Sequence, residues 1–160
     1  QRSYVRYLDL VFENADGLAD LIAEGRLGLT RYSLTGTSGV NVSLAGKATA
    51  AGNKITLDFG VQGIGGNRNS AAGDGYYGLR LDADDNGSFE TVRNFYRLLG
   101  DTNGDRTVNA TDRNNVNANF GRRGTLNADV NGDGVVNSTD RNLVNTQFGR
   151  KIASTLVLHD

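Results

Sequence analysis

Apolar and polar residues alternate along several short runs of the first hundred residues. In residues 54–61, KITLDFGV, nearly every second residue is a large apolar one. A period of two residues is typical of a strand with one buried face, so this run predicts a β-strand. The runs VNVSLAG, residues 40–46, and YYGLRLDAD, residues 76–84, show similar alternation and predict two more strands.

Three other stretches depart from this alternation. Residues 4–12, YVRYLDLVF, are apolar on both faces, which predicts a central strand covered on both sides. Residues 18–25, LADLIAEG, predict one short helix with its larger apolar residues turned inward. Residues 91–100, TVRNFYRLLG, fit either a helix or a last strand, and both interpretations stay open.

Turn-forming residues separate these runs. The chain has 22 Gly and many Asn, Thr and Ser, which favours short strands joined by turns over long helices. Residues 1–98 are therefore expected to form a small antiparallel β-sandwich. Cys is absent, which excludes disulfides, thiolate metal ligands and a cysteine nucleophile.

Beyond Gly100 the chain contains an internal duplication. Residues 101–112, DTNGDRTVNATD, and residues 129–140, DVNGDGVVNSTD, are identical at eight of twelve positions. The next ten residues, RNNVNANFGR and RNLVNTQFGR, share seven more. Two copies in register predict a repeated structural unit, each a polar loop followed by a short helix.

The helical part of each unit has its own pattern. A valine and a phenylalanine lie four residues apart and so share one helix face, and a glycine follows where a left-handed helix end is expected. These residues are Val116, Phe120 and Gly121 in the first copy, and Val144, Phe148 and Gly149 in the second.

The alternating oxygen-bearing residues of the loops predict calcium binding. Calcium takes six to eight oxygen ligands, and a loop wrapped around the ion supplies them from alternate residues. The expected ligands of the first loop are Asp101, Asn103, Asp105, the carbonyl of Thr107, Asn109 and Asp112. Those of the second are Asp129, Asn131, Asp133, the carbonyl of Val135, Asn137 and Asp140. This is an EF-hand arrangement that closes with Asp, and the alternative is a pair of solvated Asx-turns.

The sixth loop position differs between the copies. The backbone turns sharply there and favours glycine, which is present as Gly134 but replaced by Arg106 in the first loop. A positive φ at Arg106 would cost on the order of 1 kcal/mol, so the first site is expected to be the weaker. The apolar residues at the eighth position, Val108 and Val136, are expected to pack on each other.

The duplicated region carries few apolar residues for its length. Segments of about fifty residues have marginal cores, and three carboxylates in each loop repel one another. We therefore expect calcium binding to be coupled to folding in this part of the chain.

The loop, short helix, linker, loop and short helix of residues 101–150 resemble a type I dockerin. The resemblance implies two antiparallel helices braced by two calcium ions, and docking onto a cohesin module of a cellulosome or another extracellular bacterial assembly, such as one that degrades polysaccharides. It also implies recognition residues at the tenth and eleventh loop positions and along the helices. These are Ala110, Thr111, Asn117, Ala118 and Arg122 in the first copy, and Ser138, Thr139, Asn145, Thr146 and Arg150 in the second.

The first half weakly resembles the Ig-like modules of large bacterial surface proteins, through SYVRYLDLVF and the run YRLLGDTNGD. A carbohydrate-binding sandwich is an alternative, with Tyr76, Tyr77 and Phe89 as its platform. The stretch DADDNGSFE offers a third candidate metal site or a plain turn. Its oxygen-bearing residues are Asp82, Asp84, Asn86 and Glu90.

The expected fold class is thus a mainly β, Ig-like N-terminal sandwich, residues 1–98, followed by a small all-α dockerin-like domain with two calcium loop–helix motifs, residues 99–151. Residues 152–160 form a tail that is expected to add a strand. The chain is expected to be part of a larger polypeptide at the cell surface or outside the cell.

Composition excludes several classes of function. With 17 Lys and Arg against 18 Asp and Glu, no strong field attracts nucleic acid, and no apolar run is long enough to span a bilayer. His159 is the only histidine and lies next to the C-terminus, and the remaining acids form no evident catalytic pair, so no enzyme is expected. The alternative to a docking module is a calcium-stiffened stalk of a surface protein.

Overall fold

The computed structural model describes residues 3–34 and 39–153, and within them two antiparallel sheets and three short α-helices. One sheet has the order β1-β5-β4, formed by Tyr7–Val11, Lys54–Asp58 and Ala48–Ala51. The other has the order β3-β2-β6-β7, formed by Gly39–Asn41, Leu27–Tyr32, Gly75–Leu81 and Glu90–Arg97. The helices are α1, Leu18–Ala23, α2, Ala110–Ala118, and α3, Ser138–Thr146, with a 3₁₀ turn at Ala71–Gly73.

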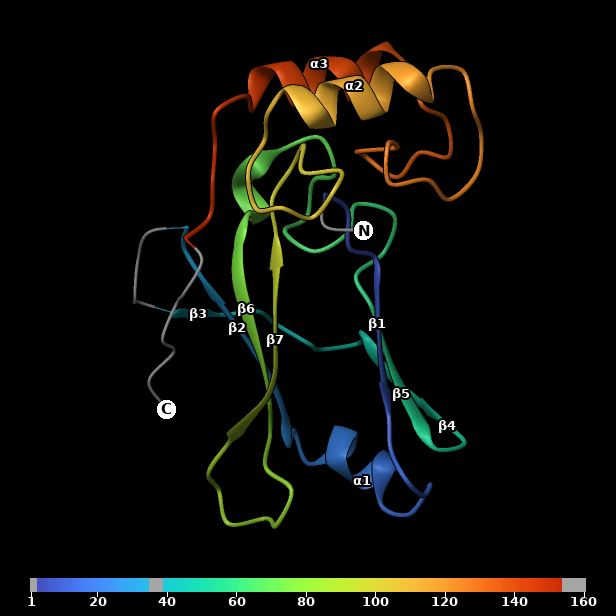
Figure 1. The fold of residues 1–160 in the computed structure, drawn as a ribbon. Coiled ribbons are helices and arrows are strands. Elements are labelled where there is room, and N and C mark those ends of the chain that lie inside the picture. The colour runs from blue at the N-terminus through green and yellow to red at the C-terminus, as the bar shows by residue number, and fades with distance from the viewer. Residues whose placement is uncertain (1–2, 35–38, 154–160) are drawn as a thin grey trace.

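The two sheets pack face to face through the apolar residues that alternate along their strands. Ile55 and Leu57 of β5 are completely buried, together with Leu29 of β2 and Tyr77 of β6. Leu18 of α1 closes one end of this cluster, as its helical spacing predicts. Figure 1 shows the sheets side by side, with α1 at one end and α2 and α3 at the other.

The prediction of a covered central strand in residues 4–12 is wrong. The strand β1 lies at the edge of its sheet and pairs only with β5 among the described residues. Its side chains alternate between half-buried and exposed, and Tyr7 and Val11 face solvent. The Arg6 guanidinium stacks on the Tyr7 ring, which partly explains how this aromatic residue is accommodated on an exposed face.

The ambiguous segment at residues 91–100 is a strand up to Arg97, and residues 98–100 lead into a turn. It extends β7 along the full length of β6, with Tyr96 opposite Tyr76 and Phe95 opposite Tyr77. Phe95 and Tyr77 stack with ring centroids 5.0 Å apart. Cross-strand aromatic packing and a backbone ladder, interrupted by one register shift between Leu79 and Arg80, are available only to the extended form. Tertiary pairing therefore overrides the helical spacing of the apolar residues.

The expected Ig-like fold class is wrong in its strand order. A constant-type immunoglobulin domain has strands A, B, E and D in one sheet and C, F and G in the other. Here the second strand, β2, pairs with β3 and β6 and therefore belongs to the opposite sheet. Its register with β6 runs unbroken from Leu27 opposite Leu81 to Tyr32 opposite Tyr76.

The expected small all-α C-terminal domain is also wrong. α2 and α3 have 9 residues each, and most of residues 101–150 outside them are turns and loops. Two isolated bridges, Thr107 with Lys151 and Arg123 with Val135, add extended backbone. Asp, Asn and Gly dominate the segments between the helices, and their side chains bond to nearby backbone amides in place of helical bonds.

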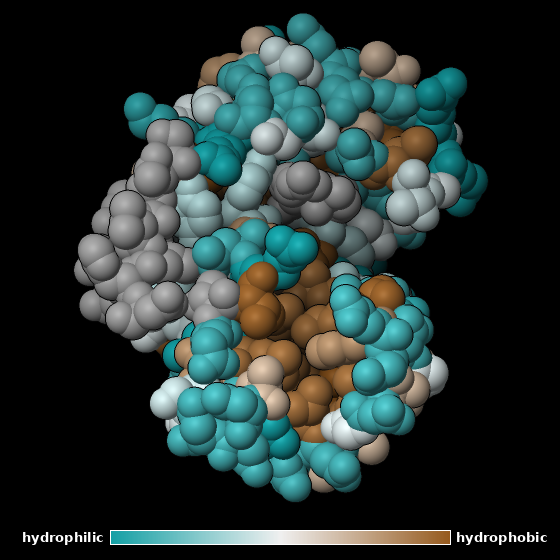
Figure 2. Space-filling model, turned by 60° about the horizontal axis from the view of Figure 1, so that its bottom comes forward, coloured by the Kyte–Doolittle hydropathy of each residue, from teal (hydrophilic) through white to brown (hydrophobic). Residues whose placement is uncertain are grey.

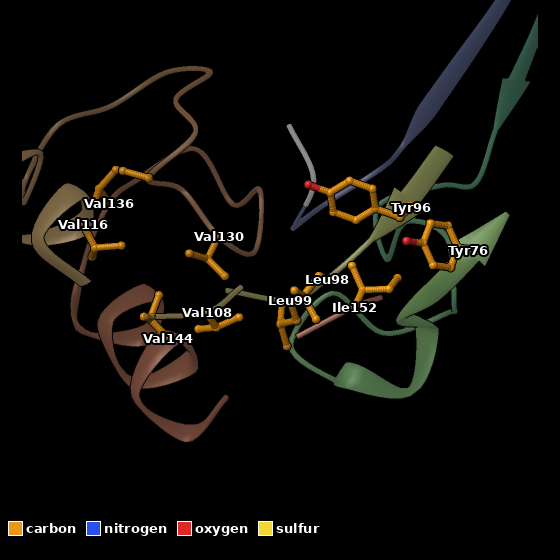
Figure 3. Packing of buried hydrophobic residues seen from close by; sticks show 11 residues of the cluster. Tyr76, Tyr96, Leu98, Leu99, Val108, Val116, Val130, Val136, Val144 and Ile152 are labelled. Atoms are coloured by element: carbon orange, nitrogen blue, oxygen red, sulfur yellow. The ribbon is translucent and has the colours of Figure 1, made fainter. Parts of the chain in front are cut away.

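One apolar cluster joins the C-terminal helices to the four-stranded sheet. Val116 of α2 and Val144 of α3 belong to the same buried cluster as Tyr76 and Tyr96 of the sheet. Figure 3 shows Leu98 and Leu99 between these two groups. The cluster crosses the expected boundary at residue 98. That boundary remains a prediction, and the strand expected in residues 152–160 falls almost entirely outside the described residues.

An apolar groove lies between the two sheets, away from α2 and α3 (Figure 1). It has a volume of about 610 Å³ and lies between β1 and β7, with Leu8, Leu10 and Phe95 among its lining residues. Figure 2 shows apolar residues exposed in a hollow of this end of the molecule. No described helix is long and apolar enough to cross a membrane.

A buried ion pair fixes the loop that carries the 3₁₀ turn. The Arg97 guanidinium is about 1 % exposed and donates from Nη1 to Asp74 Oδ1 at 2.9 Å. Its other nitrogens donate to the carbonyls of Ser3 and Ser70, both at 3.0 Å. Burial raises the pKa of Asp74, although Arg97 and Arg150 act in the opposite direction. Because both charges are buried, losing either partner would leave the other charge uncompensated.

We predict that Arg97→Met lowers the free energy of unfolding by about 3–5 kcal/mol, because it leaves the buried Asp74 carboxylate without its main partner. Arg150→Met is the matched control, since this side chain also contacts Asp74 but is 30 % exposed. Its loss should cost much less. Urea denaturation of the three proteins measures both effects, and equal losses for the two variants would contradict the prediction.

Candidate metal centre

The first loop is organised around two fully buried carboxylates, Asp101 and Asp112. Asp101 accepts hydrogen bonds from the Gly104 amide at 2.6 Å and the Arg106 amide at 3.0 Å. Asp112 accepts from the Thr102 amide at 2.7 Å and from the Asn109 amide at 2.8 Å. The first and last residues of the loop thus hold its backbone in a closed ring.

The second loop repeats this geometry. Asp129 accepts from the Gly134 amide at 2.8 Å, and Asp140 accepts from the Val130 and Asn137 amides, each at 2.8 Å. Asp140 is completely buried. The equivalence of the two loops follows from their shared sequence, because the same residues at the same spacing make the same local bonds.

Two of the expected ligands in each copy also begin the helix that follows. Asn109 caps α2 and Asn137 caps α3, each accepting a hydrogen bond from the amide two residues on. Asp112 and Asp140 complete capping boxes by accepting from the amides of these asparagines. The sequence carries this signal as Asn followed by Asp three residues later, so the same residues predict both a helix start and metal ligands.

The backbone angles support the expected strain at the sixth loop position. Arg106 has φ of 70° and Gly134 has φ of 91°, so both copies adopt the left-handed conformation there. The glycines that end the helices, Gly121 and Gly149, have φ of 82° and 83°. The first loop therefore carries a conformational cost that the second avoids.

Each loop pairs with the end of the opposite helical unit. The Val108 amide donates to the Arg150 carbonyl at 2.8 Å, and the Val136 amide donates to the Arg122 carbonyl at 2.9 Å. The two bonds are equivalent under exchange of the copies, which gives the region an approximate twofold symmetry. Both valines are completely buried in the shared cluster, and direct packing of one on the other stays a prediction.

The remaining expected ligands lie around the rims of the loops. Asn103, Asp105 and Asp133 are exposed, while Asn131 is buried. The side-chain amide of Asn103 donates to Asp105 Oδ2 at 2.9 Å. Within the described ranges, no three His, Cys, Asp or Glu side chains meet closely enough to hold an ion by themselves. A calcium site in these loops would therefore also need amide and carbonyl oxygens, which both loops contain.

The electrostatics of the loops fit a cation. Burial raises the pKa of Asp101, Asp129 and Asp140, and this effect is only partly offset, by the hydrogen bond from Tyr96 and backbone amides at Asp101 and by backbone amides at the other two. No Lys or Arg of the described residues forms an ion pair with Asp101 or Asp140. Carboxylates buried without a cationic partner are costly, and a bound dication would remove that cost.

The third candidate metal site has the geometry of a turn. Asp82 accepts from the Asn86 amide at 3.1 Å and the Gly87 amide at 3.0 Å. Asp84 accepts from the side chain of Asn86, and Glu90 lies exposed at the start of β7. Local hydrogen bonds satisfy Asp82 and Asp84, and metal binding by this segment stays a prediction.

The expected recognition residues lie mostly at the surface. All ten are exposed except Arg150, which is partly buried and donates to Asp74 Oδ2 at 2.6 Å. Its counterpart Arg122 is exposed and donates to Oδ1 of the neighbouring Asn119 at 3.0 Å. The equivalent positions of Arg122 and Arg150 in the repeat predict equal exposure. Contact with Asp74 of the sheet region buries part of Arg150 and makes the two arginines unequal.

Two phenylalanines near the ends of α2 and α3 lie at the surface, and the sequence did not predict this. Phe120 and Phe148, expected to share a helix face with Val116 and Val144, lie in the turns just after α2 and α3 and are about half exposed. The Arg141 guanidinium lies 5.7 Å from the Phe120 ring centroid, and Arg113 lies 5.7 Å from that of Phe148. Each pair joins one copy to the other, and the arginine after each closing aspartate is the sequence signal for it.

The proposed carbohydrate platform is not formed. Tyr77 is fully buried and Tyr76 is 7 % exposed, so neither ring offers a face to a sugar. Only Phe89 of the three is exposed, and the Arg80 guanidinium lies over it.

Residues 99–149 match the family model of the dockerin type I domain. The match covers both loops and both helices. No curated protein and no solved structure matches the chain.

We predict that Gly134→Ala lowers the free energy of unfolding by about 1 kcal/mol. The added Cβ meets nothing within 4 Å, so the only cost is the φ of 91° that the backbone must keep. Asn142→Ala, at an exposed helical position, is the control and should not destabilise the protein. Thermal unfolding measures the difference, and an unchanged melting temperature for Gly134→Ala would contradict the prediction.

Proposed function

Because residues 99–149 are a type I dockerin domain, we propose that this region binds two calcium ions and docks onto a cohesin module. The observation that carries the proposal is the pair of equivalent loops, each closed by a buried aspartate that also begins a helix. Calcium, when bound, would supply positive charge at the centre of each loop. The chain's own residues close the loop, orient the oxygens and start the helix.

The expected ligands are those of the two alternating sets. In the first loop they are Asp101, Asn103, Asp105, Thr107, Asn109 and Asp112, and in the second Asp129, Asn131, Asp133, Val135, Asn137 and Asp140. The closed first loop holds Arg106 in a left-handed conformation that glycine adopts freely but arginine does not, so we propose that the first loop binds calcium more weakly than the second.

The docking surface is proposed to comprise the first turns and outer faces of α2 and α3. Ala110 and Thr111 begin α2, and Ser138 and Thr139 stand at the equivalent positions of α3, all of them exposed. Small hydroxyl-bearing residues on a rigid helix start suit close backbone approach by a partner. Arg113, Arg141 and Arg122 are also exposed, so the partner surface is proposed to be acidic.

Such a module carries no catalysis of its own. We propose that it anchors a larger extracellular bacterial protein, and the degradation of polysaccharides by an attached enzyme is one setting for it. A structural stalk is the second candidate, because one apolar cluster joins the helices to the sheet region and would make the two parts rigid together. A docking module must bind a cohesin and a stalk need not, so a measurement of cohesin binding distinguishes the two functions.

The calcium proposal predicts two ions per chain by isothermal titration calorimetry. Asp112→Asn and Asp140→Asn should each abolish one of the two binding events, because the closing carboxylate of one loop is lost while its twin remains. Glu13→Gln, an exposed acid far from the loops, is the control. Excess EGTA should also reduce the helical circular dichroism signal, and an unchanged signal would contradict the coupling of calcium to folding.

Docking predicts calcium-dependent retention of this chain by at least one member of a panel of immobilised cohesin modules. Ser138→Asp with Thr139→Asp should weaken retention at least tenfold, because charge is placed against an acidic partner. Thr49→Asp, exposed on β4, is the matched control. Calcium-dependent folding without retention by any cohesin would reject docking and support the stalk.

A further inference from the structure

The sheet region reaches the first calcium loop through a tyrosine of β7. The Tyr96 hydroxyl donates to Asp101 Oδ2 at 2.9 Å, and both residues are buried. From the other side, the Ser3 hydroxyl donates to the Asp101 carbonyl at 3.0 Å and accepts from the Gly100 amide at 3.1 Å. The opening residue of the loop is thus held at its carboxylate and at its backbone by residues outside the loop.

A different segment of the sheet region reaches the second loop at its third position. The side-chain amide of Asn131 donates to Asn69 Oδ1 at 3.0 Å, and Asn131 is only 2 % exposed. The same NH₂ group also donates to Asp133 Oδ2 at 3.2 Å, so one bond from outside the loop and one from inside it together fix which way the Asn131 amide is turned. The Asn131 oxygen points back into the loop, where it accepts from the Asp133 amide at 3.1 Å.

Packing supports the second contact. A Cβ placed on Gly132 would lie 2.1 Å from a ring atom of Tyr4, so the loop backbone rests directly against that ring. Gly132 itself has φ of 68°. Asn103, the equivalent residue of the first loop, makes the matching bond to Asp105 within its own loop, but its side chain is exposed where that of Asn131 is buried against Asn69. The two loops are therefore supported at different positions despite their shared sequence.

We infer that Tyr96 and Asn69 are positioning residues for calcium, Tyr96 for the first loop and Asn69 for the second. Neither would touch the ion; each orients one ligand oxygen before the ion arrives. Hydrogen bonds to metal ligands from outside the coordination sphere typically contribute 10- to 100-fold to metal affinity. This inference rests on the proposed calcium binding, and it makes each site depend separately on the sheet region.

The test measures calcium affinity one loop at a time by isothermal titration calorimetry on the whole chain. Asp140→Asn leaves the first loop as the only site, and Asp112→Asn leaves the second. Into each background we would introduce Tyr96→Phe, which removes only the hydroxyl, or Asn69→Ala, which truncates an exposed side chain. Tyr76→Phe is the matched control, because its hydroxyl donates to the Ala153 carbonyl and not to a loop residue.

Each substitution is expected to weaken calcium binding at one loop only, and the two substitutions at different loops. Tyr96→Phe should weaken calcium at the first loop about tenfold and leave the second within twofold, while Asn69→Ala should do the reverse. Equal weakening at both loops would show a general loss of stability and overturn the inference, and so would unchanged affinity at both. A wild-type chain that binds no calcium at all would instead refute the proposed function.

Discussion

The C-terminal architecture depends on the hydrogen bonds that backbone amides donate to a buried carboxylate at the end of each loop. Asp112 accepts hydrogen bonds from amides at both ends of its loop and so closes the ring. The same side chain completes the cap of α2, as Asp140 does for α3. Loop closure and helix initiation are therefore a single event in each copy. Because these carboxylates are removed from water, the same arrangement that builds the loops also favours a cation within them.

The sheets and the helices are held together by more than one kind of contact. Apolar packing runs from Tyr76 and Tyr96 to the valines of α2 and α3. Polar contacts follow the same seam, with Arg97 and Arg150 converging on Asp74 and with Tyr96 bonded to Asp101. A region with few apolar residues of its own thus shares the core of its neighbour. This explains how two nine-residue helices can be placed firmly despite marginal intrinsic stability.

Several elements were predictable because their signals are local. The alternation around Ile55 and Leu57 gives β5, and the spacing around Leu18 gives α1. The repeat predicts two equivalent loop–helix units and the unusual backbone of Arg106. The edge position of β1, the strand at Glu90–Arg97 and the placement of β2 were not predictable in this way. Each depends on which strand lies alongside, and hydrophobic alternation does not encode the neighbour.

The sequence by itself determined what is repeated: two loops with alternating oxygen donors, each with a closing aspartate and a following helix. These features depend on residues within about twenty positions, so local hydrogen bonds and backbone preferences suffice. Only the tertiary structure decided where the repeat is broken. Arg150 donates a hydrogen bond to Asp74, whereas its counterpart Arg122 is exposed. Tyr96 bonds to the first position of the first loop, and Asn69 bonds to the third position of the second. The two similar copies become unequal here because an asymmetric neighbour packs against a nearly symmetric pair.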